Sequence, residues 1–263
     1  MTAADRARRA AEYLAQLRRA GTLPAARPRS LPADLAPHSE QQAYAVQRAL
    51  TQTLGARVGA WKVAMSSATQ GSAAPIFAED LYHSPAQVPC VIGDSLGLEP
   101  EVAFSVRCDL PSLPDGGHYR QAEIIDAIDA AYAAIEIVVS RFQSHDGATP
   151  LDRLADNISN AGLVLSAPCN DWRRLDFRTV PLELTLRSAD GVRVQHCSRG
   201  GHPLGEPLAA LLWLLNDRTH GLGGLRAGEV VTTGSYAGLH HAARGSRVSV
   251  DFAGLGAVAL EVA

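Results

Sequence analysis

A glutamate inside an apolar strand constrains this chain more than any other feature of its sequence. Glu136 lies in the run Ala134-Ile-Glu-Ile-Val-Val139, whose β-branched residues predict a buried β-strand. An ionised carboxylate in such a place costs several kcal/mol unless it is paired with a cation or bound to a metal ion. The fold must therefore bring positive charge to this strand, and an arginine such as Arg141 is one alternative to a metal ion.

A single lysine lies in a second apolar run. Of the 24 lysines and arginines only Lys62 is a lysine, and it lies within Gly59-Ala-Trp-Lys-Val-Ala-Met65. Arginine is a planar fork that stays protonated, whereas an ammonium is a compact charge whose pKa shifts readily on burial. Perturbed ionisable groups cluster at functional sites. Lys62 is therefore a candidate for holding an oxyanion or moving a proton, and a leftover surface lysine is the alternative.

Two further carboxylates lie just before a third apolar run. Glu99 and Glu101 flank Pro100 and are followed by Val-Ala-Phe-Ser-Val. On a strand, side chains two residues apart share one face, so these carboxylates repel each other unless a cation lies between them. Exposed alternation explains this pair when it is taken alone. With Glu136, however, the three form an all-oxygen set that suits Mg²⁺ or Mn²⁺ rather than zinc.

The composition indicates an ordinary globular protein. The 263 residues are 46% hydrophobic, and the net charge of −3 argues against a nucleic-acid partner. The four cysteines show no paired spacing, so we expect free thiols in a reducing compartment. The sequence shows neither a signal peptide nor a run of about 18 apolar residues, so we expect a cytoplasmic protein without a membrane span.

The first 56 residues predict a helical cap, and the rest predicts mainly strands. Residues 2–20 and 39–54 read as helices, the second with a capping box at Ser39 and Gln42, and residues 22–37 read as a proline-rich connector. We expect strands at 58–65, 101–106, 134–139, 163–166, 180–187, 192–197, 229–233, 247–252 and 257–262, and helices at 119–133 and 204–219. Many strands with few helices predict an α+β fold with a mixed, mostly β core, in which residues 1–56 and 57–263 form one compact unit.

Six motifs, spread in order over about residues 40–262, resemble a single family. Gly-Ala-Trp-Lys-Val-Ala-Met-Ser-Ser (59–67) is similar to Gly-Tyr-Lys-(Ile/Val)-Gly-Leu-Thr-Ser, and Glu99-Pro-Glu-Val-Ala-Phe to Glu-Ala-Glu-Ile-Ala-Phe. The others are Ala134-Ile-Glu-Ile-Val-Val-Ser-Arg-Phe, Leu154-Ala-Asp-Asn-Ile-Ser159, Gly201-His-Pro-Leu with Trp213-Leu, and Leu225-Arg-Ala-Gly-Glu-Val-Val-Thr-Thr-Gly-Ser235. Together they resemble the 2-keto-4-pentenoate hydratase family of the fumarylacetoacetate hydrolase-like superfamily, which includes the 4-oxalocrotonate decarboxylases.

The resemblance implies a fold of the fumarylacetoacetate hydrolase C-terminal-domain type and a divalent metal site. It implies that Glu99, Glu101 and Glu136 bind Mg²⁺ or Mn²⁺ and that Lys62 lies beside the metal. The related C–C hydrolases complete this set with aspartate, so a glutamate at position 136 favours the hydratase and decarboxylase branch.

The resemblance also implies residues that contact the substrate. It places Ser159 and Thr233 near the substrate carboxylate, although Ser159 could equally make local turn hydrogen bonds. Residues 71–80 are only loosely similar to the family, and Asp80, with Glu79 as the alternative, is the best match to the acidic residue that would orient or deprotonate water. Residues 195–201 also depart from the family before His202, for which we expect a structural role at the start of the helix from residue 204.

The activity that the resemblance implies is that of a hydro-lyase. It would add water to a 2-hydroxy-2,4-dienoate of the 2-oxo-4-pentenoate type and yield a 4-hydroxy-2-oxo acid, as in meta-cleavage catabolism of aromatic compounds. The alternatives are a metal-dependent 4-oxalocrotonate-type decarboxylase, an acylpyruvate C–C hydrolase that Glu136 disfavours, and a non-catalytic partner subunit. The implied partners are a small 2-oxo or 2-hydroxydienoic acid and further copies of this chain in a homo-oligomer, with a complex with a paired pathway enzyme left open.

Overall fold

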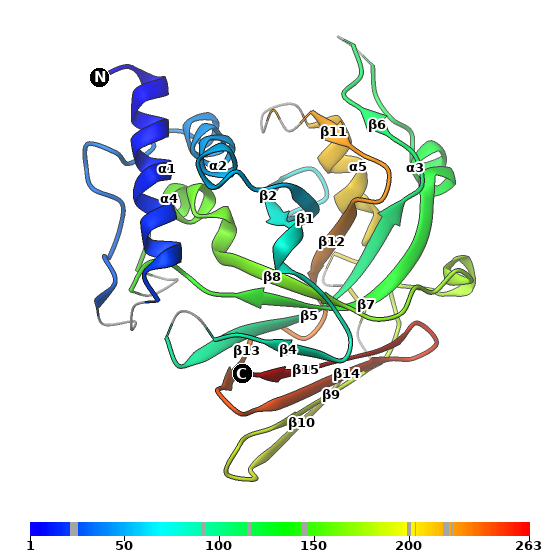
Figure 1. Cartoon of the computed structure of the whole chain (residues 1–263). Helices are drawn as coiled ribbons and strands as arrows, with labels where there is room; N and C mark the ends of the chain where they lie inside the picture. The colour runs from blue at the N-terminus through cyan, green and yellow to red at the C-terminus, as the bar shows by residue number, and fades with distance from the viewer. Residues whose placement is uncertain are drawn as a thin grey trace.

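The computed structural model describes residues 1–21, 26–90, 93–114, 117–143, 147–198, 201–202, 204–217, 221 and 223–263. Within these ranges a helical layer lies beside a large mixed sheet, and a smaller sheet packs beneath the large one (Figure 1). The prediction of an α+β fold with a mostly β core and N-terminal helices is confirmed. No described helix combines the length and the apolar character that a membrane span requires.

Both predicted N-terminal helices are present. Helix α1 spans Ala3–Arg19, and helix α2 spans Glu40–Leu54. The Ser39 hydroxyl accepts a hydrogen bond from the backbone amide of Gln42 at 3.3 Å and so caps α2 at its start. At its end Gly55 adopts the left-handed conformation, with a φ of 64°, that glycine takes without strain. Of the predicted connector, residues 22–25 lie outside the described ranges.

A separate apolar cluster holds these helices against the rest of the molecule. The cluster joins α1, α2 and α4 (Pro150–Ala155) through side chains such as Leu14 and Leu50. Gln47 of α2 is buried, and its Nε2 donates hydrogen bonds to the carbonyl oxygens of Ala73 at 3.1 Å and Leu154 at 2.6 Å. One side chain thus ties α2 both to the large sheet and to α4. We keep the boundary between residues 56 and 57 as a proposal.

The large sheet carries the charged residues that the sequence singled out. Its strand order is β2-β1-β12-β5-β7-β8-β3, and β13 pairs with the other part of β5. The strands are β1 (Val58–Met65), β2 (Gly71–Phe77), β3 (Leu81–His83), β5 (Ser95–Val106), β7 (Ile128–Val138), β8 (Asn160–Leu165), β12 (Val230–Ser235) and β13 (His240–Ala243). The pairs β1–β12 and β3–β8 are parallel and the others antiparallel, so the sheet is mixed. Strand β5 changes partner at Pro100, because residues 101–105 pair with β12 and residues 95–98 with β13.

The smaller sheet covers one face of the large one. Its order is β10-β9-β14-β15-β4, with bounds β4 (Ala86–Val88), β9 (Leu182–Arg187), β10 (Arg193–Ser198), β14 (Arg247–Phe252) and β15 (Gly256–Val262). Strands β14 and β15 pack against β7. The core includes Val102 and Ile135 from the large sheet and Val250 and Val258 from the small one. Because side chains alternate along a strand, the glutamates of β5 and β7 lie on the opposite face.

The structure corrects several predicted elements. The helix expected over 119–133 is only α3 (Gln121–Ala127), and β7 already begins at Ile128, because pairing with β5 outweighs the helix preference of its alanines. The helix expected over 204–219 is α5 (Leu208–Asn216), with residues 218–219 outside the described ranges. Within the two sheets described above, strands β2, β3, β4 and β13 were not predicted.

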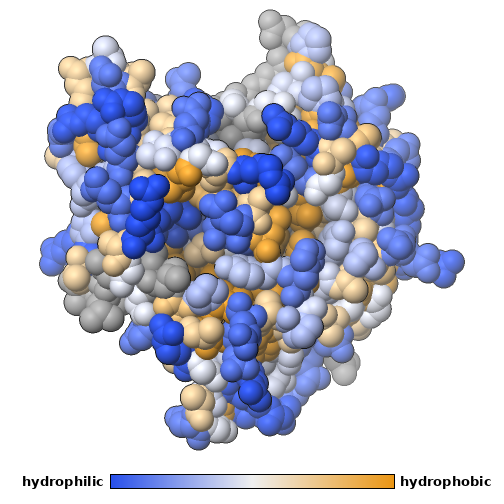
Figure 2. Space-filling model, in the orientation of Figure 1, coloured by the Kyte–Doolittle hydropathy of each residue, from blue (hydrophilic) through white to orange (hydrophobic). Residues whose placement is uncertain are grey.

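An open cleft lies between helix α2 of the helical cap and a short two-stranded pair. It has a volume of about 960 Å³ and runs between α2, the start of β1, and the two-stranded pair β6 (Leu110–Pro111) and β11 (Gly224–Leu225). Apolar surface shows in the upper middle of Figure 2, between hydrophilic regions on either side. The cleft is separate from the glutamates of β5 and β7, which do not line it.

The position of Gln47 predicts its contribution to stability. Gln47→Ala removes the side chain that donates hydrogen bonds to two buried carbonyl groups. We expect it to lower the free energy of unfolding by about 1–3 kcal/mol. Gln52→Ala is the matched control, because Gln52 is exposed on the same helix, and we expect a change within about 0.5 kcal/mol. Urea unfolding of both variants measures the difference, and equal stabilities would contradict the prediction.

Candidate metal centre

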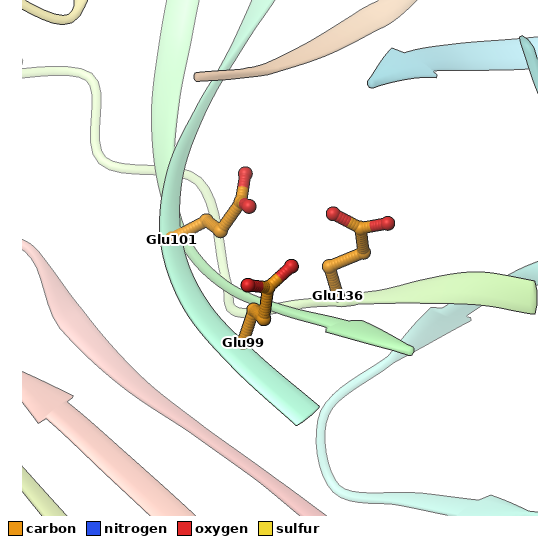
Figure 3. A group of neighbouring side chains, drawn as sticks. All are labelled: Glu99, Glu101 and Glu136. Atoms are coloured by element: carbon orange, nitrogen blue, oxygen red, sulfur yellow. The ribbon is translucent and has the colours of Figure 1, made fainter. Parts of the chain in front are cut away.

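Three carboxylates converge from two neighbouring strands. In the antiparallel pairing of β5 and β7, Glu99 lies directly opposite Glu136, and Glu101 follows two residues further along β5 on the same face. One carboxylate oxygen of each lies within 4.8 Å of the others, and Figure 3 shows the three side chains pointing toward a common point. The grouping expected from the sequence is therefore present.

These carboxylates carry more negative charge than their surroundings favour. Glu136 is 0% and Glu101 1% exposed, whereas the Glu99 side chain is 23% exposed. Burial and the two neighbouring carboxylates raise the pKa of Glu101 well above its usual value, and burial likewise raises the pKa of Glu136. A cation between the three carboxylates would offset their mutual repulsion and the cost of burying their charge.

Lys62 supplies part of that charge. Its Nζ lies 2.8 Å from Glu136 Oε1 and 3.7 Å from Glu99 Oε2. Burial alone would lower the pKa of the lysine, but the attraction of the three carboxylates outweighs it and raises the pKa. Lys62 therefore carries its proton at neutral pH.

The buried arginine that the sequence suggested as a partner of Glu136 has another role. Arg141 Nε donates to Asp156 Oδ1 at 2.6 Å, and both side chains are buried. The ion pair between Glu136 and Arg141 is thus a wrong alternative, and the lysine takes that place. Two strands, β12 and β5, separate β1 from β7, so Lys62 reaches Glu136 across the face of the sheet.

The arrangement fits a divalent cation. Glu136 Oε1 accepts hydrogen bonds from Lys62 and from Asn160 Nδ2 at 2.9 Å, whereas Glu136 Oε2 is buried and has no hydrogen-bond partner among the described residues. A buried carboxylate oxygen without a partner is costly unless a cation faces it. Three oxygen ligands also match the preference of Mg²⁺ and Mn²⁺. The residues Glu99, Glu101 and Glu136 could therefore hold such an ion.

Strand β12, on the other side of β5 from β7, holds Glu101 in place. The amide of Gly234 donates to Glu101 Oε2 at 3.0 Å, and Gly234 has a φ of 108°, which favours glycine. Just before it, the carbonyl of Thr233 accepts a hydrogen bond from His202 Nε2 at 2.6 Å. The other ring nitrogen, His202 Nδ1, accepts from the amide of Leu204, so the histidine is the neutral Nε2–H tautomer.

A left-handed turn packs against the lysine. Asn157, Ile158 and Ser159, which form the short helical turn η3, have φ values of 51°, 52° and 60°. Such conformations cost about 1–3 kcal/mol each in non-glycine residues and persist where the surroundings enforce them. The carbonyl of Ile158 accepts a hydrogen bond from Lys62 Nζ at 3.4 Å. The strained turn thus lies at the candidate site.

The carboxylates open into a cavity of about 280 Å³. Its polar lining includes Lys62, Glu99, Glu101, His202 and Thr233. Most of the remaining lining is apolar, namely Val63, Ala64, Met65, Val138, Ile158, Leu204 and Leu239. The cavity therefore has one charged end and one apolar region, which suits a small acid with a hydrocarbon tail.

The other predicted residues are placed differently with respect to this cavity. Thr233 lines it, but its hydroxyl donates to the carbonyl of Val102 at 2.9 Å. Ser159 is buried in the left-handed turn and does not line it. Glu79 and Asp80 lie on the short turn η2 (Ala78–Asp80) after β2, also outside the lining, and the structure does not bring them to the three glutamates. His202 accepts a hydrogen bond from the amide of Leu204, which is a structural contact, but α5 begins at Leu208 rather than near residue 204.

Sequence reasoning missed two groups that contact the carboxylates. Asn160 follows Ser159 directly and is a buried polar residue at the start of β8, which the sequence could have flagged. Gly234 lies in the Thr-Thr-Gly-Ser motif, but its amide contact depends on the backbone alone. Which carboxylate each of them contacts depends on the strand register.

Comparison with known proteins assigns the chain to a group of relatives. No protein-family model matches it. It is 30% identical to the TodF product hydratase of Pseudomonas putida over 229 residues, which are 83% of this chain and 82% of the relative. It is 31% identical to a 2-keto-4-pentenoate hydratase of Burkholderia vietnamiensis over 228 residues, 82% of this chain and 83% of the relative.

A solved structure shares the fold over nearly the whole chain. The 4-oxalocrotonate decarboxylase of Pseudomonas putida G7, complexed with magnesium and adipate, superposes with a TM-score of 0.81 and covers 98% of both chains. At 19% identity this likeness concerns the fold, and it confirms the fold that the motifs implied.

The crowding of carboxylates predicts opposite effects of one substitution. Glu101→Gln removes a repelling charge, so we expect the protein treated with EDTA to melt about 2–4 °C higher than wild type. Added Mn²⁺ should raise the melting temperature of wild type and have little effect on the variant. Differential scanning fluorimetry measures both, with Glu183→Gln on the exposed face of β9 as the control. A metal-free variant that melts below wild type would contradict the prediction.

Proposed function

Because this chain belongs to the 2-keto-4-pentenoate hydratase family, we propose that it is a metal-dependent lyase that adds water to a 2-hydroxy-2,4-dienoate and yields a 4-hydroxy-2-oxo acid. The observation that carries this proposal is the convergence of Glu99, Glu101 and Glu136 with Lys62 at the charged end of a small cavity. A charged end suits the 2-oxo acid group, which such a substrate presents.

The three glutamates would hold Mg²⁺ or Mn²⁺. When bound, such an ion supplies Lewis-acid polarisation of the 2-oxo oxygen. The free oxygen Glu136 Oε2 and the more exposed Glu99 carboxylate support this assignment, since both can face a cation without breaking the hydrogen bonds described above. We propose Mg²⁺ or Mn²⁺ as the ion, without a preference between the two.

Lys62 would act on the charge that develops on the substrate. Protonation of the dienol at C5 gives an α,β-unsaturated ketone, which then accepts water at C4. The Lys62 ammonium lies beside the carboxylates and can stabilise the enolate oxygen or give up a proton to it. The roles predicted for Ser159 and Thr233 at the substrate carboxylate, and for Asp80 or Glu79 at the water, remain predictions.

The apolar region of the cavity favours a hydratase over a decarboxylase. A 4-oxalocrotonate-type substrate has a second carboxylate at its far end, which needs a cation or several donors. Among the described lining residues the apolar ones include Met65, Val138, Leu204 and Leu239, and Lys62 is the one cation. A substrate with a neutral hydrocarbon end therefore fits better.

Two expectations about the surroundings of the protein stay proposals. We propose a homo-oligomer that works in the cytoplasm, with a complex between this oligomer and a paired pathway enzyme as a further proposal. All four cysteines are free thiols in the structure, which supports a reducing compartment.

A substrate comparison tests the proposed reaction. With Mg²⁺ or Mn²⁺ present, we expect 2-hydroxypenta-2,4-dienoate to lose its dienol absorbance and form the 4-hydroxy-2-oxo acid. A dienoate with a second terminal carboxylate should react at least about tenfold more slowly in kcat/KM, a difference of about 1.4 kcal/mol. Release of CO₂ from the dioate at the higher rate would support the decarboxylase, and tight Mn²⁺ binding without turnover of either would support a non-catalytic subunit.

The lysine itself gives the second test. We expect Lys62→Ala and Lys62→Arg to reduce kcat by about 10²–10³, because each removes a compact positive charge aimed at the reacting oxygen. Calorimetric titration with Mn²⁺ checks that both variants still bind the metal, and circular dichroism checks that they fold. Near-normal turnover of Lys62→Arg would show that any cation serves at this position.

A further inference from the structure

We propose that Arg18, on the N-terminal helix α1, is a positioning residue for the metal centre. Arg18 acts on Glu136 through Asn160. The inference rests on the proposed function, because it concerns the same three carboxylates. It adds a contribution from the first 40 residues, in which none of the family motifs lies.

Asn160 is the link between the carboxylate and the arginine. Its side-chain Nδ2 donates to Glu136 Oε1 at 2.9 Å and to the carbonyl of Gly162 at 3.4 Å. Both neighbours are acceptors, so only the NH₂ end of the amide can face them, and the orientation of the side chain is fixed by chemistry. Asn160 and Lys62 together occupy Oε1 of Glu136 and leave its Oε2 without a hydrogen-bond partner among the described residues.

Two guanidinium groups hold the backbone of Asn160. Its carbonyl oxygen accepts from Arg18 Nη2 at 3.0 Å and from Arg141 Nη2 at 2.8 Å. Arg141 also donates to the side chain and the carbonyl of Asp156, which lies at the other end of the left-handed turn. Arg141 therefore clamps the turn, whereas Arg18 reaches the same carbonyl from a separate element.

The surroundings of Arg18 show that its position is built rather than incidental. Its guanidinium lies over the ring of Phe77 at 5.2 Å from the centroid. Burial and the nearby guanidinium of Arg141 lower the pKa of Arg18 to about 9, and Asp156, Asp80 and Glu79 oppose that shift. Asp156 and the acidic residues of η2 thus offset part of the repulsion between the two arginines at this carbonyl.

This contact connects helix α1 to the orientation of Glu136. If Arg18 is removed, the carbonyl of Asn160 keeps Arg141 as its guanidinium donor, and the start of β8 loses this hydrogen bond to α1. The amide of Asn160 is then free to move away from Glu136, and the carboxylate is less fixed in the position that would favour a metal ion. Groups that orient metal ligands from behind commonly contribute substantially to affinity.

Mn²⁺ binding tests the proposal without relying on catalysis. Electron paramagnetic resonance of free Mn²⁺ gives the dissociation constant of the metal-free protein for this probe. We expect Arg18→Met to raise this constant about 3–10-fold, less than the 10–100-fold typical of direct contacts to a metal ligand. Arg19→Met is the matched control, because Arg19 is exposed on the same turn of α1, and we expect a change below about twofold.

A double-mutant cycle shows whether Arg18 acts through Asn160. In an Asn160→Ala background, we expect Arg18→Met to change the Mn²⁺ dissociation constant by less than about twofold, because the link is already broken. Multiplicative effects, or equal constants for the Arg18 and Arg19 variants, would overturn the inference. Arg18→Lys keeps the charge and most of the packing, and it should give an intermediate constant if Arg18→Met fails to fold. Wild-type protein that does not bind Mn²⁺ would overturn the proposed metal centre itself, a result distinct from both.

Discussion

The repulsion among three buried carboxylates is the constraint on which the rest of this structure depends. Glu99, Glu101 and Glu136 would each be more stable in water, and the sheet brings them within a few ångströms of one another. Three strands of the sheet each offer a donor or a positive charge: β1 through Lys62, β8 through Asn160 and β12 through the amide of Gly234. These donors still leave an excess of negative charge, and a divalent cation would complete the balance.

The two faces of the large sheet differ in what they carry. One face packs on the smaller sheet and contributes apolar side chains such as Val102 and Ile135 to the core. The other face carries the charges, and the left-handed turn at 157–159 packs against Lys62 there. A rigid apolar layer behind β5 and β7 keeps the charged side chains from relaxing away from one another. The cost of strain and of buried charge is thereby concentrated on one face.

The sequence predicted which residues would need partners better than it predicted the partners. A glutamate among β-branched residues had to meet a cation, and it does, but the cation is Lys62 rather than the sequence-adjacent Arg141. That choice depends on strand order, which places β1 and β7 on either side of two other strands. The helix expected over 119–133 fails for the same reason, because pairing with β5 decides the conformation of its alanines. The order of the motifs predicted the fold and the three glutamates. The contacts of Asn160 and Gly234 and the location of Asp80 could not be predicted without knowing how the strands pair.

The order of the strands has a consequence for how this protein is made. Strand β12 lies between β1 and β5 in the sheet, although it follows β5 by more than a hundred residues in the chain. A nascent chain on the ribosome that ends before residue 230 can pair β5 with β7, but it lacks the strand that sets the lysine of β1 beside them. The carboxylates therefore meet their lysine only late in synthesis, and until then the half-built sheet exposes two strand edges to other chains.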